Sequence, residues 1–133
     1  MKKNVIVTGV TGQDGSYMVE HLLANTDYNI FGGVRRLSVP NYKNIQHIEN
    51  KRFKLIDLDL SDVHSIHEAI TKYKPSYFIN FAAQSFVGAS WSFPQQTFDV
   101  NATAVLHILE CLRKHAPECR LYNAGSSEEF GNI

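Results

Sequence analysis

The chain has 133 residues, of which 44% are hydrophobic, and its 13 lysines and arginines balance its 13 aspartates and glutamates. This length suits a single domain with a buried core. The zero net charge gives no reason to expect binding to nucleic acid or to a membrane surface, and no apolar stretch is long enough to span a bilayer. A basic start precedes an apolar run that is too short for a signal peptide, so we expect a cytoplasmic protein.

The first element along the chain is an apolar strand over residues 4–8 that runs into a glycine-rich turn. Three glycines follow the spacing Gly-x-x-Gly-x-x-Gly, and a helix over residues 14–25 begins at once. Such a turn lets a pyrophosphate approach bare backbone, and the start of the helix offers N–H donors to it. The sequence therefore predicts dinucleotide binding by Gly9, Thr11, Gly12, Gln13, Asp14 and Gly15.

The second strand, over residues 30–34, is followed by Arg35 and Arg36. A site for NAD usually has an acidic residue about twenty residues after the glycine turn, where it binds the ribose 2′-hydroxyl, whereas arginine suits the 2′-phosphate of NADP. The two arginines predict NADP as the cofactor, and a solvated pair at a strand end is the alternative. Residues 35–51 are polar and predict a long loop with one helical turn near residues 45–48.

The third strand, over residues 53–56, leads to Asp59 and Leu60, near the place expected for adenine. The Asp59 carboxylate has two interpretations: it accepts a hydrogen bond from the adenine amino group, or it starts the turn before the next helix. Ser61 and Asp62 predict the N-terminus of that helix, which ends before Pro75.

The fourth strand, over residues 77–81, is followed by small side chains at the edge where ligands bind in open parallel sheets. Ala82 and Ala83 leave room for a pyrophosphate or a ribose beside the backbone, and Gln84 and Ser85 are candidates to contact the nicotinamide side or a sugar substrate. A tight turn of small residues is the alternative. The loop over residues 82–94 then leads to a long helix over residues 95–114.

The fifth strand, over residues 120–123, leads to Ser126, Ser127 and Glu128. A carboxylate can remove a proton next to a carbonyl group, and a hydroxyl can polarise that carbonyl, so these residues are candidate catalytic groups. The same residue types also form ordinary helix caps. The six histidines and two cysteines show no metal-ligand spacing, so no metal is predicted and the thiols are expected to be reduced.

Alternating strands and helices with short connections predict an α/β fold, a doubly wound parallel sheet of the Rossmann type with strand order 3-2-1-4-5. We expect residues 1–133 to form one dinucleotide-binding domain. A complete six-stranded dinucleotide fold needs at least one more helix and strand, so the predicted domain is truncated.

Three segments together resemble the extended short-chain dehydrogenase/reductase family, and within it the GDP-mannose 4,6-dehydratases. They are the glycine turn over residues 8–17, the Val34-Arg35-Arg36 run, and the run over residues 82–91. The resemblance implies an NADP-dependent lyase that converts GDP-mannose to GDP-4-keto-6-deoxymannose by internal hydride transfer and loss of water. It places Ser126 at the usual catalytic threonine, Ser127 at the family serine and Glu128 at the base that removes the C5 proton.

The chain also departs from the family pattern. Gly125 replaces a usual serine and Asn123 a glutamine, and the family's Tyr-x-x-x-Lys pair and most substrate-binding residues are not among the 133. We therefore expect the cofactor-binding part of such an enzyme, inactive by itself and forming a homo-oligomer. The alternatives are a stand-alone NADP-binding or assembly module, or a dehydratase or epimerase for another nucleotide sugar.

Overall fold

The computed structural model describes residues 1–132, so Ile133, the last residue of the predicted domain, lies outside the described residues. Within this range the strands form one parallel sheet in the order β3-β2-β1-β4-β5. This confirms the predicted strand order and the doubly wound α/β class. The strands are β1 (Asn4–Thr8), β2 (Asn29–Val34), β3 (Phe53–Asp57), β4 (Tyr77–Asn80) and β5 (Arg120–Asn123).

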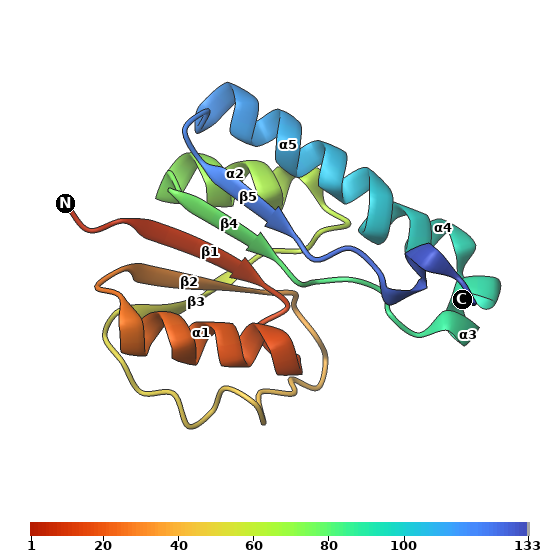
Figure 1. Cartoon of the computed structure of the whole chain (residues 1–133), viewed down its shortest axis with the longest axis horizontal. Helices are drawn as coiled ribbons and strands as arrows, with labels where there is room; N and C mark the ends of the chain where they lie inside the picture. Colours follow the sequence, from red (N-terminus) through yellow and green to blue (C-terminus); the bar gives the residue numbers. More distant parts are fainter. Residues whose placement is uncertain (133) are drawn as a thin grey trace.

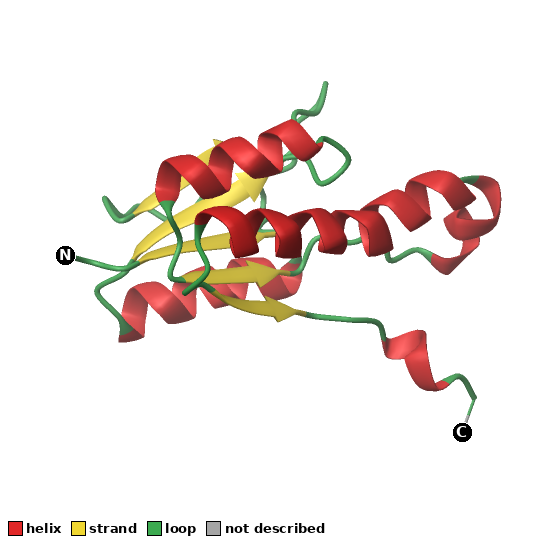
Figure 2. Cartoon of the chain, turned by 90° about the horizontal axis from the view of Figure 1, so that it is seen from above, coloured by secondary structure: helices red, strands yellow, loops and turns green. Residues whose placement is uncertain are grey.

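Helices cover both faces of the sheet (Figures 1 and 2). Helix α1 (Gln13–Asn25) lies on one face, and α2 (Val63–Tyr73) and α5 (Ala104–His115) lie side by side on the other. The side chains of β1 alternate between these layers: Val5 and Val7 pack toward α1, whereas Ile6 packs with α2 and α5. The central strand is therefore buried on both sides, as expected for a parallel sheet.

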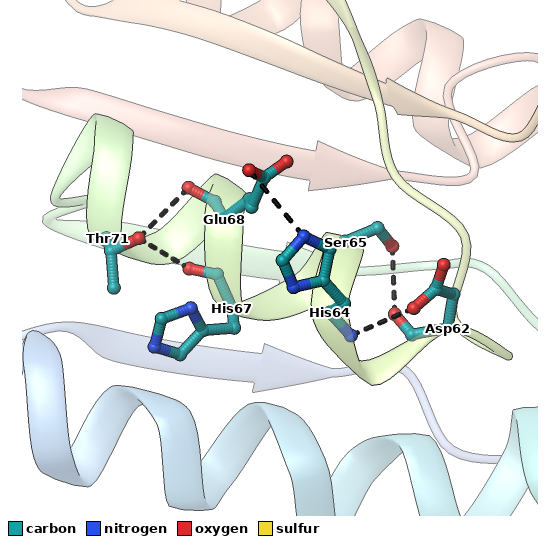
Figure 3. A network of polar contacts seen from close by, with 6 residues as sticks. All are labelled: Asp62, His64, Ser65, His67, Glu68 and Thr71. Carbon is teal, nitrogen blue, oxygen red and sulfur yellow. Dashed lines mark hydrogen bonds and ion pairs between the residues drawn. The ribbon is translucent and has the colours of Figure 1, made fainter.

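Helix α2 begins where the sequence predicts, through a local cap (Figure 3). The Asp62 carboxylate accepts a hydrogen bond from the His64 N–H at 2.9 Å, and the Ser65 hydroxyl donates to the Asp62 carbonyl. Short polar side chains at this position satisfy N–H groups that the helix itself leaves without partners. Further along, Thr71 donates back to the carbonyls of His67 and Glu68. No helix within residues 1–132 is long and apolar enough to cross a membrane.

Two predicted boundaries are wrong. Strand β4 ends at Asn80 rather than at Phe81, because β1 turns away after Thr8 and leaves Phe81 without a ladder partner. The predicted loop over residues 82–94 contains the short helix α3 (Val87–Ser92), whose N-cap position holds Phe86 and so lacks a polar capping side chain.

The predicted helix over residues 95–114 is a longer helical run with a change of winding inside it. It consists of α4 (Pro94–Phe98), the π-helical turn η1 (Asp99–Thr103) and α5. A single π turn inside an α-helix often marks a functional site.

Arg52 ties the C-terminal end of α1 to the start of β2. Its guanidinium donates to the carbonyls of Leu23, Thr26 and Tyr28 at 2.7–3.0 Å. The last carbonyls of a helix have no partners within the helix, and a charged donor satisfies them well.

We predict that Arg52→Ala lowers the free energy of unfolding by about 1.5–3 kcal/mol, because these charge-assisted hydrogen bonds are lost. Chemical denaturation measures the effect. The control is Lys51→Ala, which removes an exposed neighbouring cation of the same charge. Equal stability of the two variants would contradict the assignment.

Candidate functional site

The glycine turn joins β1 to α1 by a very close approach of backbone to backbone. Gly9 has a φ of 70°, in the left-handed region that glycine tolerates best. A Cβ on Gly15 would lie 2.1 Å from the Gly9 carbonyl oxygen, so only glycine permits this packing. Gly9 thus permits the tight turn, and Gly15 permits the close packing of the helix on the strand.

The first turn of α1 leaves backbone donors available at the carboxyl edge of the sheet. Its N-cap, Gly12, has no side chain, and the N–H groups of Gln13, Asp14 and Gly15 have no acceptor among the described residues. A helix N-terminus also carries partial positive charge. The arrangement can bind an anionic group such as a phosphate.

Two adjoining cavities, of about 560 and about 870 Å³, meet at this turn. Both are lined by Gly9, Gly12 and the segment 82–86. The first extends over β2 and β3, and the second extends toward β5 and the C-terminal residues. The strand order reverses between β1 and β4, and the crevice lies across this point. Doubly wound sheets bind their ligands at such a reversal point.

The smaller cavity contains the residues predicted for the adenosine side. Arg35 lines it directly after β2, whereas Arg36 is exposed and lines neither cavity. Asp59 and Leu60 line it after β3, but the Asp59 carboxylate already accepts hydrogen bonds from the Ser61 N–H and hydroxyl, at 2.9 and 2.7 Å. This supports the turn interpretation of Asp59. Leu60 is buried in the core, so its side chain helps to form the cavity floor.

A chain of hydrogen bonds fixes the strand ends below the crevice. The Thr8 hydroxyl donates to the Asn80 carboxamide oxygen at 2.5 Å and accepts from the Ala82 N–H at 3.2 Å. Asn80 in turn donates to the Asn123 carboxamide oxygen at 2.8 Å. Thr8 and Asn80 are only 2% and 4% exposed, so the hydrogen bond between them is well shielded from water, whereas the bonds to Ala82 and Asn123 are partly buried. They align the segments that leave β1, β4 and β5.

Asn101 clamps the segment that contains Gln84. Its carboxamide accepts from the Gln84 N–H at 2.8 Å and donates to the Gln84 carbonyl at 2.9 Å. The Gln84 side chain is also engaged, with the Phe86 backbone and the Thr97 hydroxyl. Gln84 therefore shapes this wall of the crevice through its backbone, while its side chain holds the loop. Asn101 belongs to η1, so the π turn positions the side chain that holds Gln84.

The C-terminal candidates Ser126, Ser127 and Glu128 line the larger cavity. Ser126 caps the 3-10 helix η2 (Ser127–Phe130): its hydroxyl accepts from the Glu128 N–H, and the Glu129 carboxylate accepts from the Ser126 N–H, both at 3.0 Å. The cap interpretation is thus correct for the Ser126 oxygen. The cap involves the carboxylate of Glu129. The carboxylate of Glu128 has no hydrogen-bond partner among the described residues.

Except for Arg36, every predicted site residue lines one of the two cavities. Four supporting residues, Thr8, Asn80, Asn101 and Asn123, were not predicted from the sequence. A polar residue at the end of a buried or half-buried apolar strand was a usable signal for Thr8 and Asn80. Asn123 ends the largely exposed strand β5. Asn101 carried no such signal. Away from the crevice, Cys111 and Cys119 are free thiols, and burial raises the pKa of Cys119 to about 11.

Comparison with curated proteins finds relatives along nearly the whole chain. The chain is 42% identical to GDP-mannose 4,6 dehydratase 2 of Arabidopsis thaliana, over 98% of its own length and 38% of that protein. It is 39% identical to a GDP-mannose 4,6-dehydratase of Vibrio cholerae, over 100% of its own length and 38% of that protein. The chain thus spans less than two fifths of the length of these relatives.

A solved structure and a family model also match most of the chain. The chain resembles the UDP-glucose 4-epimerase of Thermus thermophilus, solved in complex with NAD, with a TM-score of 0.70 and 29% identity over 84% of this chain and 34% of that one. The family model described as GDP-mannose 4,6 dehydratase matches residues 6–133. With a match of this extent, the chain belongs to the GDP-mannose 4,6-dehydratase family.

Proposed function

We propose that this chain is the cofactor-binding part of an NADP-dependent GDP-mannose 4,6-dehydratase. The observation that carries the proposal is the meeting of three features in one crevice: the free N–H groups of α1, Arg35 after β2, and the Ser126–Glu128 segment after β5. The first two suit the phosphates of a dinucleotide, and the third suits proton transfer on a sugar.

In this proposal the cofactor lies across the reversal point of the sheet. The turn residues Gly9 and Thr11 to Gly15 receive the pyrophosphate, and Arg35 pairs with the 2′-phosphate, with Arg36 as a second nearby cation. The adenine lies in the smaller cavity beside Asp59 and Leu60. The remaining ribose and the nicotinamide extend along Ala82, Ala83 and Gln84 into the larger cavity.

The sugar of GDP-mannose would then lie between Ser85 and the C-terminal candidates. NADP, when bound, supplies the means to take a hydride from the sugar and to return it. The Ser126 oxygen accepts from the Glu128 N–H, so its own hydrogen remains free to donate to a sugar oxygen, with Ser127 beside it. The Glu128 carboxylate, which has no hydrogen-bond partner among residues 1–132, can remove the proton at C5, which an adjacent ketone makes acidic.

A stand-alone NADP-binding module is the second candidate. None of the six tyrosines has a lysine four residues later, and the resemblance assigns the start of hydride transfer to such a pair. Residues 1–133 therefore suit cofactor binding better than turnover. A dehydratase or epimerase for another nucleotide sugar is the remaining alternative.

The predicted homo-oligomer stays a prediction. Large apolar side chains are exposed along α3, α4 and α5, including Trp91 at 86%, Phe98 at 66% and Leu106 at 59%. Exposed apolar area of this kind is typical of a surface that another protein element covers.

Cofactor preference is the first test. We predict tighter binding of NADP+ than of NAD+, and we expect Arg35→Ala to weaken NADP+ binding by about 1.5–3 kcal/mol while leaving NAD+ nearly unchanged. Isothermal titration with both dinucleotides measures this. Arg36→Ala, which alters the arginine outside the cavity wall, is expected to give the smaller loss. Equal affinity of the unsubstituted chain for both dinucleotides would contradict NADP specificity.

The clamp on Gln84 gives a second test. We predict that Asn101→Ala weakens NADP+ binding by about 1–2 kcal/mol, or about 5- to 30-fold, because the wall made by residues 82–85 loses both backbone contacts. The matched control is Glu110→Ala, an exposed position on the same helical run whose ion-pair partner among the described residues is Arg113. If both variants bind NADP+ like the unsubstituted chain, the clamp has no role in the site.

Turnover is the third test. We predict that the 133-residue chain, given NADP+ and GDP-mannose, forms no 4-keto sugar, because the Tyr-x-x-x-Lys pair is not among its residues. A general acid or base typically accelerates a reaction by about 10²–10⁴-fold, so its loss slows the reaction by a similar factor. Chromatography of the sugar nucleotides measures the product. We expect the NADP+ affinity of Glu128→Gln to stay within about twofold of that of the unsubstituted chain, because the proposed role of Glu128 is on the sugar and not on the cofactor. Product formed at ordinary enzymatic rates would contradict the prediction.

A further inference from the structure

One segment of the loop between β2 and β3 lies against α1, and its role is not explained by the contacts described so far (Figure 1). We call residues 41–48 the strap. Ile45 is 4% exposed and joins the core on the α1 face, and the His47 ring forms a hydrogen bond with the carboxylate of Glu20 in α1. The strap is therefore docked along the helix by one apolar contact and one polar contact.

Its third contact reaches the glycine turn. The Asn44 carboxamide nitrogen donates to the Thr11 carbonyl oxygen at 2.8 Å. On the other side of the same peptide group, the Gly12 N–H donates to the Gly9 carbonyl at 3.0 Å. A peptide group is planar, so hydrogen bonds at both its oxygen and its N–H fix the orientation of the whole unit.

This peptide group directly precedes the backbone donors that face the crevice. The N–H groups of Gln13, Asp14 and Gly15 follow it, and they have no acceptor among residues 1–132. Gly12 is the N-cap and has no side chain to stabilise the helix start. The orientation of the Thr11–Gly12 peptide therefore sets the direction in which α1 and its donors begin, and Asn44 supplies one of its two constraints.

We infer that Asn44 is a positioning residue for phosphate binding at the glycine turn. The inference rests on the proposed dinucleotide site. Asn44 acts through the Thr11 carbonyl and need not touch the ligand, so its effect depends on which part of a ligand reaches the turn. A ligand with a pyrophosphate at the start of α1 depends on Asn44, whereas a ligand confined to the adenosine side, near Arg35 and Leu60, does not.

The experiment compares two ligands on four proteins: the unsubstituted chain, two Asn44 variants and one control variant. NADP+ reaches the turn through its pyrophosphate, whereas adenosine 2′-monophosphate carries only the adenosine and 2′-phosphate groups. Asn44→Ala removes the contact to Thr11. The matched control, His47→Ala, removes another strap contact and leaves the turn intact. Isothermal titration gives the affinities, and thermal unfolding confirms that each variant is folded.

We expect Asn44→Ala to weaken NADP+ binding about 3- to 10-fold and to leave adenosine 2′-monophosphate within about twofold. We expect His47→Ala to leave both affinities within about twofold. Asn44→Leu, which keeps the outline of the side chain without its donor, is expected to repeat the Asn44→Ala result and serves if the alanine variant is unstable.

Four results would overturn the inference. Unchanged NADP+ affinity in both Asn44 variants would show that the contact has no role in binding. Equal losses for both ligands, or an equal loss in His47→Ala, would assign the effect to docking of the whole strap. Failure of the unsubstituted chain to bind NADP+ would overturn the proposed function, and the inference with it, so the two failures are distinct.

Discussion

The contact between Gly9 and Gly15 is the constraint on which the rest of the crevice depends. The helix passes so close to the end of β1 that a single methyl group on Gly15 would overlap the Gly9 carbonyl. This closeness brings the start of α1 to the edge where β1 and β4 end. It places the unpaired N–H groups of the helix at the junction of the two cavities. A wider helix–strand spacing would separate these donors from the residues after β4.

Amide side chains hold the segments around this turn in place. Asn44 contacts the turn itself, Asn101 clamps the segment after β4, and Asn80 bonds to Asn123 at the end of β5. A carboxamide carries both a donor and an acceptor, so it can satisfy backbone groups or a second carboxamide without adding charge. Uncharged supports suit a crevice that is expected to receive several phosphate charges, because they neither repel nor neutralise those charges.

The fold and the order of its strands could be predicted from local patterns, although the end of β4 was placed one residue too late. The glycine spacing marks the turn, and the alternation of strands and helices gives the order of the sheet through the right-handed crossover rule. The roles of Asn44 and Asn101 could not be predicted, because their partners lie 33 and 17 residues away. The sequence indicated both a catalytic role and a helix-cap role for the segment that begins at Ser126. Only the structure shows that Glu129 completes the cap. The α3 helix was missed because it lacks a polar capping side chain.

The π turn η1 lies between two parts of one helical run that face different neighbours. Asn101 within it faces the loop after β4, whereas Ala104, Ile108 and Leu112 beyond it pack on the sheet. A π turn holds one residue more than an α turn, and one residue corresponds to a rotation of about 100°. Loss of one residue from η1 would turn the clamp away from its loop or the apolar stripe away from the sheet. The extra residue therefore acts as a rotational offset that lets one helical run present Asn101 to the crevice wall and its apolar stripe to the sheet.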